Sequence, residues 1–253
     1  MRWSSRGERT LRFPANRVHL GSVRRTGWAA RIVAVVIFSG LASFGQTAQP
    51  AARFVVVLDA AHGGSDPGGT LSSGQPEKAA TLALSVRLRS LLAARGIAVV
   101  TTRESDTDVL PNDRAAIANH ANAQVCLNLH ASETGSGVHL FVSSLAPSPP
   151  ERFVPWKTAQ ATAITSSIAL AGALNAALLH AGVNVTLGRT ALITVDSMTC
   201  PAVAVELAPQ RGSDNQITAQ PDDPDYQARI ATTLATALLE WRSEASHMEA
   251  RQP

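Results

Sequence analysis

The chain has 253 residues, of which 45% are apolar and 16% are charged, and it contains two cysteines. This composition excludes a disordered chain, which is poor in apolar residues, and a small disulfide-rich scaffold. Residues 1–53 carry nine arginines and one acidic residue, which leaves 13 of the 22 basic and 18 of the 19 acidic residues for the rest, a net charge of −5. We therefore expect no nucleic-acid partner for the folded part.

The first 52 residues are predicted to be a signal peptide followed by a short linker. An apolar run of 13 residues, 32–44, follows a basic region and precedes small and polar residues, as in secretory signal peptides. This run is shorter than the ~20 residues that span a bilayer as a helix. An uncleaved anchor is the alternative, since no clean A-x-A cleavage site follows. We expect a periplasmic or secreted protein that meets the membrane only through this segment.

Residues 53–243 alternate between strand and helix patterns, which predicts one α/β domain. The β-branched run 54–58 is typical of a strand buried on both faces. Residues 77–95 form a helical pattern, with apolar residues three and four apart, that ends before Gly96. The other predicted elements are strands over 97–102, 124–129, 137–142 and 201–206 and helices over 112–123, 158–181 and 225–241. We expect a mostly parallel, twisted sheet with helices on both faces, a proline-rich loop over 146–155 and a disordered tail over 244–253.

The two cysteines, Cys126 and Cys200, both lie in apolar, strand-like runs. A buried thiol commonly behaves as a small hydrophobic side chain. An oxidising compartment permits a disulfide, but the sequence does not place the two Cα atoms within reach. We predict that both cysteines are free and buried rather than bridged.

Four reactive side chains lie where the predicted strands end or a helix begins. His62 comes shortly after the first strand, His130 directly after the third, and Glu206 at the end of the last, while Glu77 begins the first long helix. In an open α/β sheet such groups meet beyond the carboxyl ends of the strands. Two imidazoles and one carboxylate are the protein ligands of a catalytic zinc ion, and a second carboxylate is then needed for proton transfer.

The spacing of these residues matches no short local zinc motif. Taken alone, the placement leaves open that each histidine is a hydrogen-bonded loop residue.

An ordered series of motifs carries a more specific signal. The matching segments are Leu58-Asp-Ala-Ala-His-Gly-Gly-Ser-Asp-Pro-Gly68, Gly74-x-x-Glu77-Lys78, Thr102-Arg103-x-x-Asp106, Leu110-x-x-x-Arg114, Ala118-Asn119, Leu129-His130-Ala131, Gly137 and Pro201-Ala-Val-Ala-Val-Glu206. Over residues 54–207 this series resembles the zinc-dependent N-acetylmuramoyl-L-alanine amidases of the amidase-3 type. The resemblance implies that His62, Glu77 and His130 bind one zinc ion and that Glu206 is the catalytic carboxylate. It also implies hydrolysis of the amide bond between N-acetylmuramic acid and L-alanine in peptidoglycan.

Three segments depart from the family pattern. The family usually has Asp-Pro-Gly-His where this chain has Asp-Ala-Ala-His over 59–62, and Ser-Ile-His-x-Asn where this chain has Asn-Leu-His-Ala-Ser over 128–132. After Glu206 the usual Gly-Phe pair and a following Asn are replaced by Leu-Ala-Pro-Gln over 207–210. No implied metal ligand or base is lost, so we expect these changes to affect substrate preference and rate.

Other polar residues have simpler interpretations. We expect Arg103 with Asp106, and Arg114, to form structural ion pairs rather than to bind substrate carboxylates. Asn128 lies on the same strand face as the second histidine and is a candidate to support it. His139 has equal chances of facing inward or outward, and we do not include it among the ligands.

Two other functions share this ligand set: another zinc amidohydrolase or peptidase of the cell envelope, and a non-catalytic peptidoglycan-binding protein on the same scaffold. The second needs no base beside the metal, so Glu206 argues against it. The sequence shows no repeated wall-binding module, and targeting then depends on the domain itself or on a protein activator. We expect a monomer, in which residues 145–166 form a lid, an inhibitory segment or a partner contact.

Overall fold

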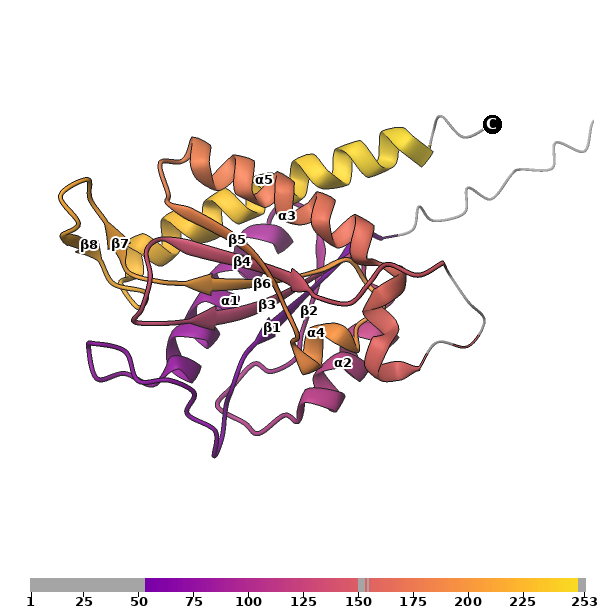
Figure 1. Ribbon diagram of the computed structural model, residues 1–253, viewed down its shortest axis with the longest axis horizontal. Coiled ribbons are helices and arrows are strands. Elements are labelled where there is room, and N and C mark those ends of the chain that lie inside the picture. The colour runs from indigo at the N-terminus through magenta and orange to yellow at the C-terminus, as the bar shows by residue number, and fades with distance from the viewer. Residues whose placement is uncertain (1–52, 150–152, 154, 250–253) are drawn as a thin grey trace, which may run out of the picture. The chain divides into compact units, whose positions relative to one another are not determined.

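The computed structural model describes residues 53–149, 153 and 155–249, and Figure 1 shows how their elements are arranged. The predicted signal segment and linker over 1–52, part of the predicted proline-rich loop and residues 250–253 lie outside the described residues. The signal segment therefore stays a prediction.

The centre of the domain is a six-stranded sheet in the order β2-β1-β3-β6-β4-β5. Its strands are β1 (Val55–Ala60), β2 (Ala98–Thr101), β3 (Val125–Ala131), β4 (Val138–Ser143), β5 (Val185–Thr190) and β6 (Ala202–Leu207). Neighbouring strands are parallel except β4 and β6, which run antiparallel. The predicted mostly parallel sheet is confirmed. Two short strands, β7 (Gln210–Arg211) and β8 (Ile217–Ala219), pair separately.

Helices cover both faces of the sheet, as predicted (Figure 1). On one face lie α1 (Glu77–Ala93), α3 (Ile164–His180) and α5 (Pro224–Glu249), which share the larger hydrophobic core with the strands. On the other face lie α2 (Pro111–His120) and the short α4 (Ile193–Asp196), which pack over a smaller core. The sheet is therefore buried on both sides, as the continuous apolar runs of β1 and β6 require.

The alternation of β3 separates core residues from site residues. Leu127 and Leu129 enter the larger core, whereas Cys126 packs in the smaller one. Successive strand residues point to opposite faces, so Asn128 and His130 share the face of Cys126. Polar side chains of β3 thus lie toward α2 and away from the main core.

The sequence pattern does not indicate strand β5. This strand is at the edge of the sheet, and Thr186, Leu187 and Arg189 are exposed. A half-exposed strand with polar residues and a glycine lacks the buried apolar run on which the other predictions rest.

The predicted helix over 158–181 consists of two parts. The 3-10 helix η1 (Trp156–Thr162) and α3 meet at an angle of 65°. The buried side chain of Gln160 fixes the first part, because it donates hydrogen bonds to the carbonyl oxygens of Met198 and Cys200 and accepts one from the hydroxyl of Ser167. Among the described helices, none alone is long and apolar enough to span a membrane. The bent pair of η1 and α3 reaches that length and hydropathy only when the two parts are taken together.

The last helix is longer than predicted. We expected α5 to end at Trp241 and a disordered tail to begin at residue 244, but the helix continues to Glu249. Residues 242–249 contain neither glycine nor proline and include good helix formers, so nothing in the sequence stops the helix at 241.

The prediction of free cysteines is wrong. Cys126 and Cys200 form a disulfide, with Cα atoms 6.0 Å apart and a sequence separation of 74. Both are buried, as predicted. The pairing of β3 with β6 brings them together, since the backbone N–H of Cys126 donates to the carbonyl oxygen of Pro201 at 2.9 Å. That proximity is a tertiary property, which neither local segment reveals.

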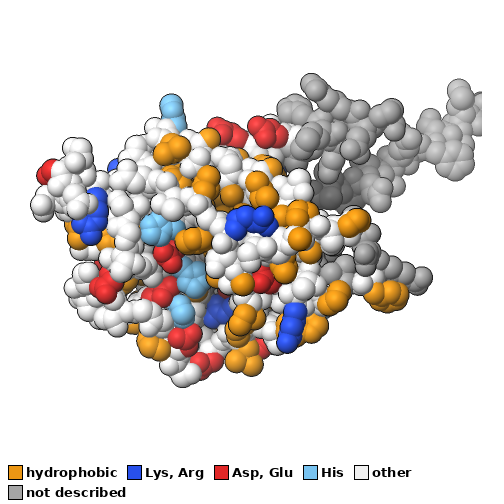
Figure 2. All heavy atoms as spheres, in the orientation of Figure 1, with side chains coloured by type: hydrophobic (Ala, Val, Ile, Leu, Met, Phe, Trp, Pro, Cys, Tyr) orange, Lys and Arg blue, Asp and Glu red, His pale blue; other side chains and the backbone are white. Residues whose placement is uncertain are grey.

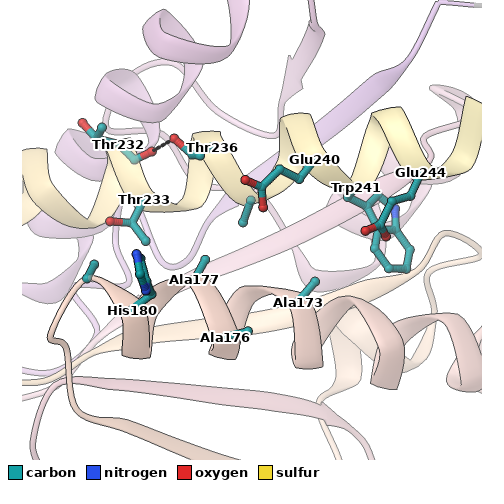
Figure 3. Close-up of a pocket in the computed structure, with 12 residues that line it drawn as sticks. Ala173, Ala176, Ala177, His180, Thr232, Thr233, Thr236, Glu240, Trp241 and Glu244 are labelled. Atoms are coloured by element: carbon teal, nitrogen blue, oxygen red, sulfur yellow. Dashed lines mark hydrogen bonds between the residues drawn. The ribbon is translucent and has the colours of Figure 1, made fainter.

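A groove of about 530 Å³ runs between α3 and α5 (Figure 3). Its lining is mostly alanine and threonine, with Trp241 and Glu244 at one end and His180 near the other. All of these residues belong to the two helices except Ala181, which directly follows α3, and none is a predicted site residue. The groove is therefore separate from the groups at the strand ends.

The disulfide is expected to stabilise the domain. Replacing both cysteines by alanine should lower the free energy of unfolding by about 2–4 kcal/mol, because the unfolded chain loses a long closed loop. Urea unfolding with and without reductant measures this change. Reductant should lower the unfolding midpoint of the wild type and leave that of the double variant unchanged. Equal midpoints for the wild type in both conditions would show that the bridge adds no stability.

Candidate metal centre

The three predicted ligands come from three elements that meet at one end of the sheet. His62 lies in the turn after β1, with a φ of 61°, and two glycines with positive φ follow it. Glu77 is the first residue of α1, and His130 lies near the end of β3. One possible ligand atom from each of the three lies within 4.8 Å of the other two. In the view of Figure 2, histidine and acidic side chains lie next to one another near the middle of the visible surface.

Glu77 is the centre of the cluster. One carboxylate oxygen lies 3.1 Å from His62 Nε2, and the other lies 2.8 Å from His130 Nδ1. The backbone N–H groups of Gly69 and Ala131 also donate to the carboxylate, at 3.0 and 3.2 Å. The side chain is buried, so these contacts hold it in a single position between the two rings.

The surroundings of Glu77 keep it ionised. Burial raises the pKa of a carboxyl group, but here the hydrogen bonds from His130, His62 and Gly69 outweigh burial and hold the pKa of Glu77 well below its ordinary value. The same contact raises the pKa of His62, with burial opposing it and Asp66 adding to the rise. Before any metal binds, the cluster therefore favours an ionised Glu77 next to a readily protonated His62.

Hydrogen bonds orient both rings. His62 Nδ1 lies 2.7 Å from a carboxylate oxygen of Asp66, which leaves Nε2 toward Glu77. His130 Nε2 lies 2.9 Å from the side-chain oxygen of Asn128, which leaves Nδ1 toward Glu77. A ring N–H that donates to such a partner leaves the other nitrogen unprotonated for a metal ion. The predicted supporting role of Asn128 agrees with this contact, whereas the role of Asp66 toward His62 was not predicted.

A buried ionic network lies behind His130. The side-chain amide of Asn128 donates to one carboxylate oxygen of Asp59 at 2.7 Å. The other oxygen accepts hydrogen bonds from Arg114, at 2.7 Å, and from Thr102, at 2.6 Å. Asp59 is fully buried and Arg114 nearly so. Arg114 therefore has the structural ion-pair role that we predicted.

Arg103 also has a structural role, but not with the predicted partner. Its guanidinium donates to the carbonyl oxygens of Ala60, Ala61 and Lys78, at 2.7–3.0 Å. Asp106 instead pairs with the side chain of Lys78 at 2.7 Å and accepts from the backbone N–H of Gly64. The sequence places Arg103 and Asp106 near each other, yet the exposed carboxylate turns to the lysine that follows Glu77.

Glu206 lies beside the cluster without belonging to it. In the parallel pairing of β3 with β6 it is opposite His130, and in the antiparallel pairing of β4 with β6 it is opposite His139. Its carboxylate contacts His139 Nδ1 at 2.8 Å. The sequence did not decide which way the His139 side chain faces. Its contact with Glu206 depends on the pairing of β4 with β6, which the segment around His139 does not reveal.

The donor set suits a metal ion. Two imidazole nitrogens and one carboxylate oxygen are the protein ligands of catalytic zinc sites, which keep a further position open for water or substrate. Each imidazole has an oriented second nitrogen, as metal-ligating histidines almost always do. Glu206 is opposite His130 in the pairing of β3 with β6 and stays outside this donor set.

A family model described as N-acetylmuramoyl-L-alanine amidase (amidase-3) matches residues 56–240. The chain belongs to this amidase family. The match covers nearly the whole described domain and includes the four residues selected from the sequence: His62, Glu77, His130 and Glu206. The resemblance stated from the sequence motifs is thereby confirmed.

Curated relatives match over shorter stretches. The chain is 38% identical over 82 residues to the sporulation-specific N-acetylmuramoyl-L-alanine amidase of Bacillus subtilis, a stretch of 32% of each protein. It is 40% identical over 77 residues to amidase AmiA of Escherichia coli, 30% of this chain and 27% of AmiA. It is 31% identical over 122 residues to the germination-specific amidase of B. subtilis, 41% of this chain and 51% of that protein. The matched stretch is less than two thirds of each relative.

Solved structures show the same fold. The catalytic domain of the amidase CwlV from Bacillus (Paenibacillus) polymyxa has a TM-score of 0.57 at 24% identity, and the match covers 75% of this chain and 98% of that domain. The amidase Ami1 of Mycobacterium abscessus has a TM-score of 0.60 at 20% identity, with 74% and 98% covered.

Removing the support of His130 should weaken metal binding. In Asn128→Ala the ring loses its partner at Nε2, and we expect about a 10- to 100-fold loss of Zn²⁺ affinity. Competition with a chromogenic chelator measures the affinity. Asn119→Ala is the matched control, because Asn119 bonds to Ser197 and Thr199 and not to the cluster. Equal Zn²⁺ affinities for both variants would contradict the supporting role of Asn128.

Metal affinity should rise with pH. A metal ion binds the unprotonated imidazole, so protons compete with it. Because the pKa of His62 lies above its usual value of 6.5, this competition continues to a higher pH than for an ordinary histidine. The apparent Zn²⁺ affinity should therefore increase from about pH 6 to about pH 8 as the ring loses its proton. The exposed His120 provides a control, since His120→Asn should leave the profile unchanged, and a flat wild-type profile would contradict the assignment.

Proposed function

We propose that this protein is an exported, zinc-dependent N-acetylmuramoyl-L-alanine amidase that hydrolyses the amide bond between N-acetylmuramic acid and L-alanine in peptidoglycan. One observation carries the proposal: within a domain of this family, Glu206 lies next to a cluster of two imidazoles and one carboxylate and remains outside it. Family membership supports the substrate class, the cluster supplies the proposed metal ligands, and Glu206 supplies the proposed proton-transfer group.

His62, Glu77 and His130 are proposed to hold one zinc ion. When bound there, zinc supplies Lewis acidity, which lowers the pKa of a water molecule and polarises a carbonyl oxygen. Because Glu77 is the only anionic side chain of the three, the site keeps a net positive charge for this purpose. Asp66 and Asn128 hold the rings in place, at 2.7 and 2.9 Å.

Glu206 is proposed to transfer the proton. Its carboxylate takes a proton from water while the water oxygen forms a bond to the amide carbonyl carbon. The carbon–nitrogen bond then breaks, and Glu206 returns the proton to the nitrogen of L-alanine. The products are a muramic acid carboxylate and a peptide with a free amino terminus. The same side chain thus acts as base and acid, which requires it to be free of the metal.

Export and partners are further parts of the proposal. The predicted signal segment over 1–52 supports a periplasmic or secreted location, which is where peptidoglycan lies. The amidase CwlD of Clostridioides difficile, whose fold matches with a TM-score of 0.56 at 19% identity, was solved in complex with the GerS lipoprotein. That complex supports including a protein partner besides peptidoglycan, which we propose to be an activator; we also propose that the protein is a monomer.

Glu206→Gln tests the role of the base. The variant should bind about one zinc ion, as the wild type does, while its rate of stem-peptide release falls by about 10²- to 10⁴-fold, because no side chain accepts the proton. Metal analysis and labelling of new amino termini measure the two quantities. Glu104→Gln, which changes an exposed glutamate paired with Arg89, is the matched control and should retain full activity.

Each result has a definite meaning. A wild type that binds zinc but leaves peptidoglycan intact would contradict the substrate and favour another zinc amidohydrolase or peptidase of the cell envelope. A wild type that binds no zinc would contradict the ligand set and favour a non-catalytic peptidoglycan-binding protein. A fully active Glu206→Gln variant would refute the role of Glu206 alone.

A further inference from the structure

His139 is the one titratable side chain that contacts Glu206 among the described residues. Its Nδ1 lies 2.8 Å from Glu206 Oε1, and its side chain is largely buried, with 14% exposed. Nothing in the metal cluster needs this histidine, since His62, Glu77 and His130 already meet without it. The contact therefore concerns Glu206 itself.

The backbone fixes where the His139 side chain lies. It is directly opposite Glu206 in the antiparallel pairing of β4 with β6, and residues directly opposite one another on neighbouring strands present their side chains on the same face. Two residues further along the same pairing, Phe141 is opposite Ala204, and its ring packs edge-on to that of His139, with centroids 6.2 Å apart. Strand register and ring packing thus direct His139 toward the carboxylate.

A close backbone approach holds the other edge of the ring. Gly135, with a φ of +89°, lies against the Cε1–Nε2 edge of His139, and a Cβ atom at this position would overlap the ring. Arg211 donates to the carbonyl oxygen of Gly135 at 3.3 Å, which ties this turn to β7. The ring therefore has the backbone of Gly135 on one side and Glu206 on the other.

We infer that His139 is a positioning residue for Glu206, whose Nδ1–H holds Oε1 and leaves Oε2 to exchange protons with water and the leaving nitrogen. The expected effect on turnover rests on the proposed function, whereas the contact between His139 and Glu206 does not depend on it. A carboxylate held at one oxygen presents the other in a constant direction, so the loss of the contact affects proton transfer more than substrate binding.

The test compares three replacements in the full protein. His139→Leu removes the donor and should lower kcat by about 10- to 100-fold at unchanged KM and zinc content. His139→Asn places an amide N–H near the position of Nδ1 and should retain most of the wild-type kcat. His139→Gln reaches the position of Nε2 instead and should lose as much kcat as His139→Leu. Equal loss of kcat in all three variants, or no loss in His139→Leu, would overturn the inference.

A double-mutant cycle separates positioning from a direct contact with substrate. In a Glu206→Ala background, His139→Leu should cause no further loss of kcat, because the group it positions is gone. A further loss in that background would show that His139 acts on the substrate directly. Thermal unfolding of each variant checks that the losses do not reflect unfolding.

A spectroscopic measurement tests the contact independently of activity. In ¹⁵N-histidine-labelled protein, long-range ¹H–¹⁵N correlations should show the His139 ring protonated at Nδ1, and Glu206→Ala should change that signal. An unchanged signal would overturn the inference even in an active enzyme. If the wild type leaves peptidoglycan intact while the signal responds to Glu206→Ala, the proposed function fails and the positioning contact stands.

Discussion

The buried carboxylate of Asp59 connects the sheet to both histidines of the candidate metal centre. Burying an ion is expensive unless partners surround it, and Asp59 has Arg114, Thr102 and Asn128. Arg114 also donates to the carbonyl oxygen of His62 at 2.6 Å, so the same ion pair fixes the turn after β1. Asn128 carries the effect to His130. One interior charge therefore determines the arrangement on both sides of Glu77.

Strand pairing supplies the second organising constraint. His130, Glu206 and His139 form one row across β3, β6 and β4, because each is opposite the next in register. A slip of one residue in either pairing would turn a side chain to the other face of the sheet. The disulfide joins the beginning of β3 to the residues just before β6. It therefore lies at the end of these two strands that is away from the site. The alignment of His130 with Glu206 is thus a property of the sheet more than of any loop.

The sequence predicts what depends on single segments and misses what depends on pairing. Strand ends and the first residue of a helix are visible in local patterns, so His62, Glu77, His130 and Glu206 could be chosen before the structure. The contact of His139 and the bridge of Cys126 depend on β6 lying between β3 and β4, an order that no segment encodes by itself. Edge strand β5 was missed for a related reason, since half-exposed residues weaken the apolar pattern.

The departures from the family pattern differ in what they affect. Residues 60 and 61 are buried alanines, and only their backbone serves the site: the carbonyl oxygens accept from Arg103 and Arg114, and the N–H of Ala61 donates to Leu129. A Pro-Gly pair at 60 and 61 offers the same two carbonyl oxygens and the same N–H at 61, so we expect this change to leave His62 and His130 in place. The segment 207–210 instead follows Glu206 directly and bonds to Gly137 in the turn that leads to His139. Changes there act beside Glu206, so we expect them, and not the alanines, to set the difference in substrate preference between this chain and its relatives.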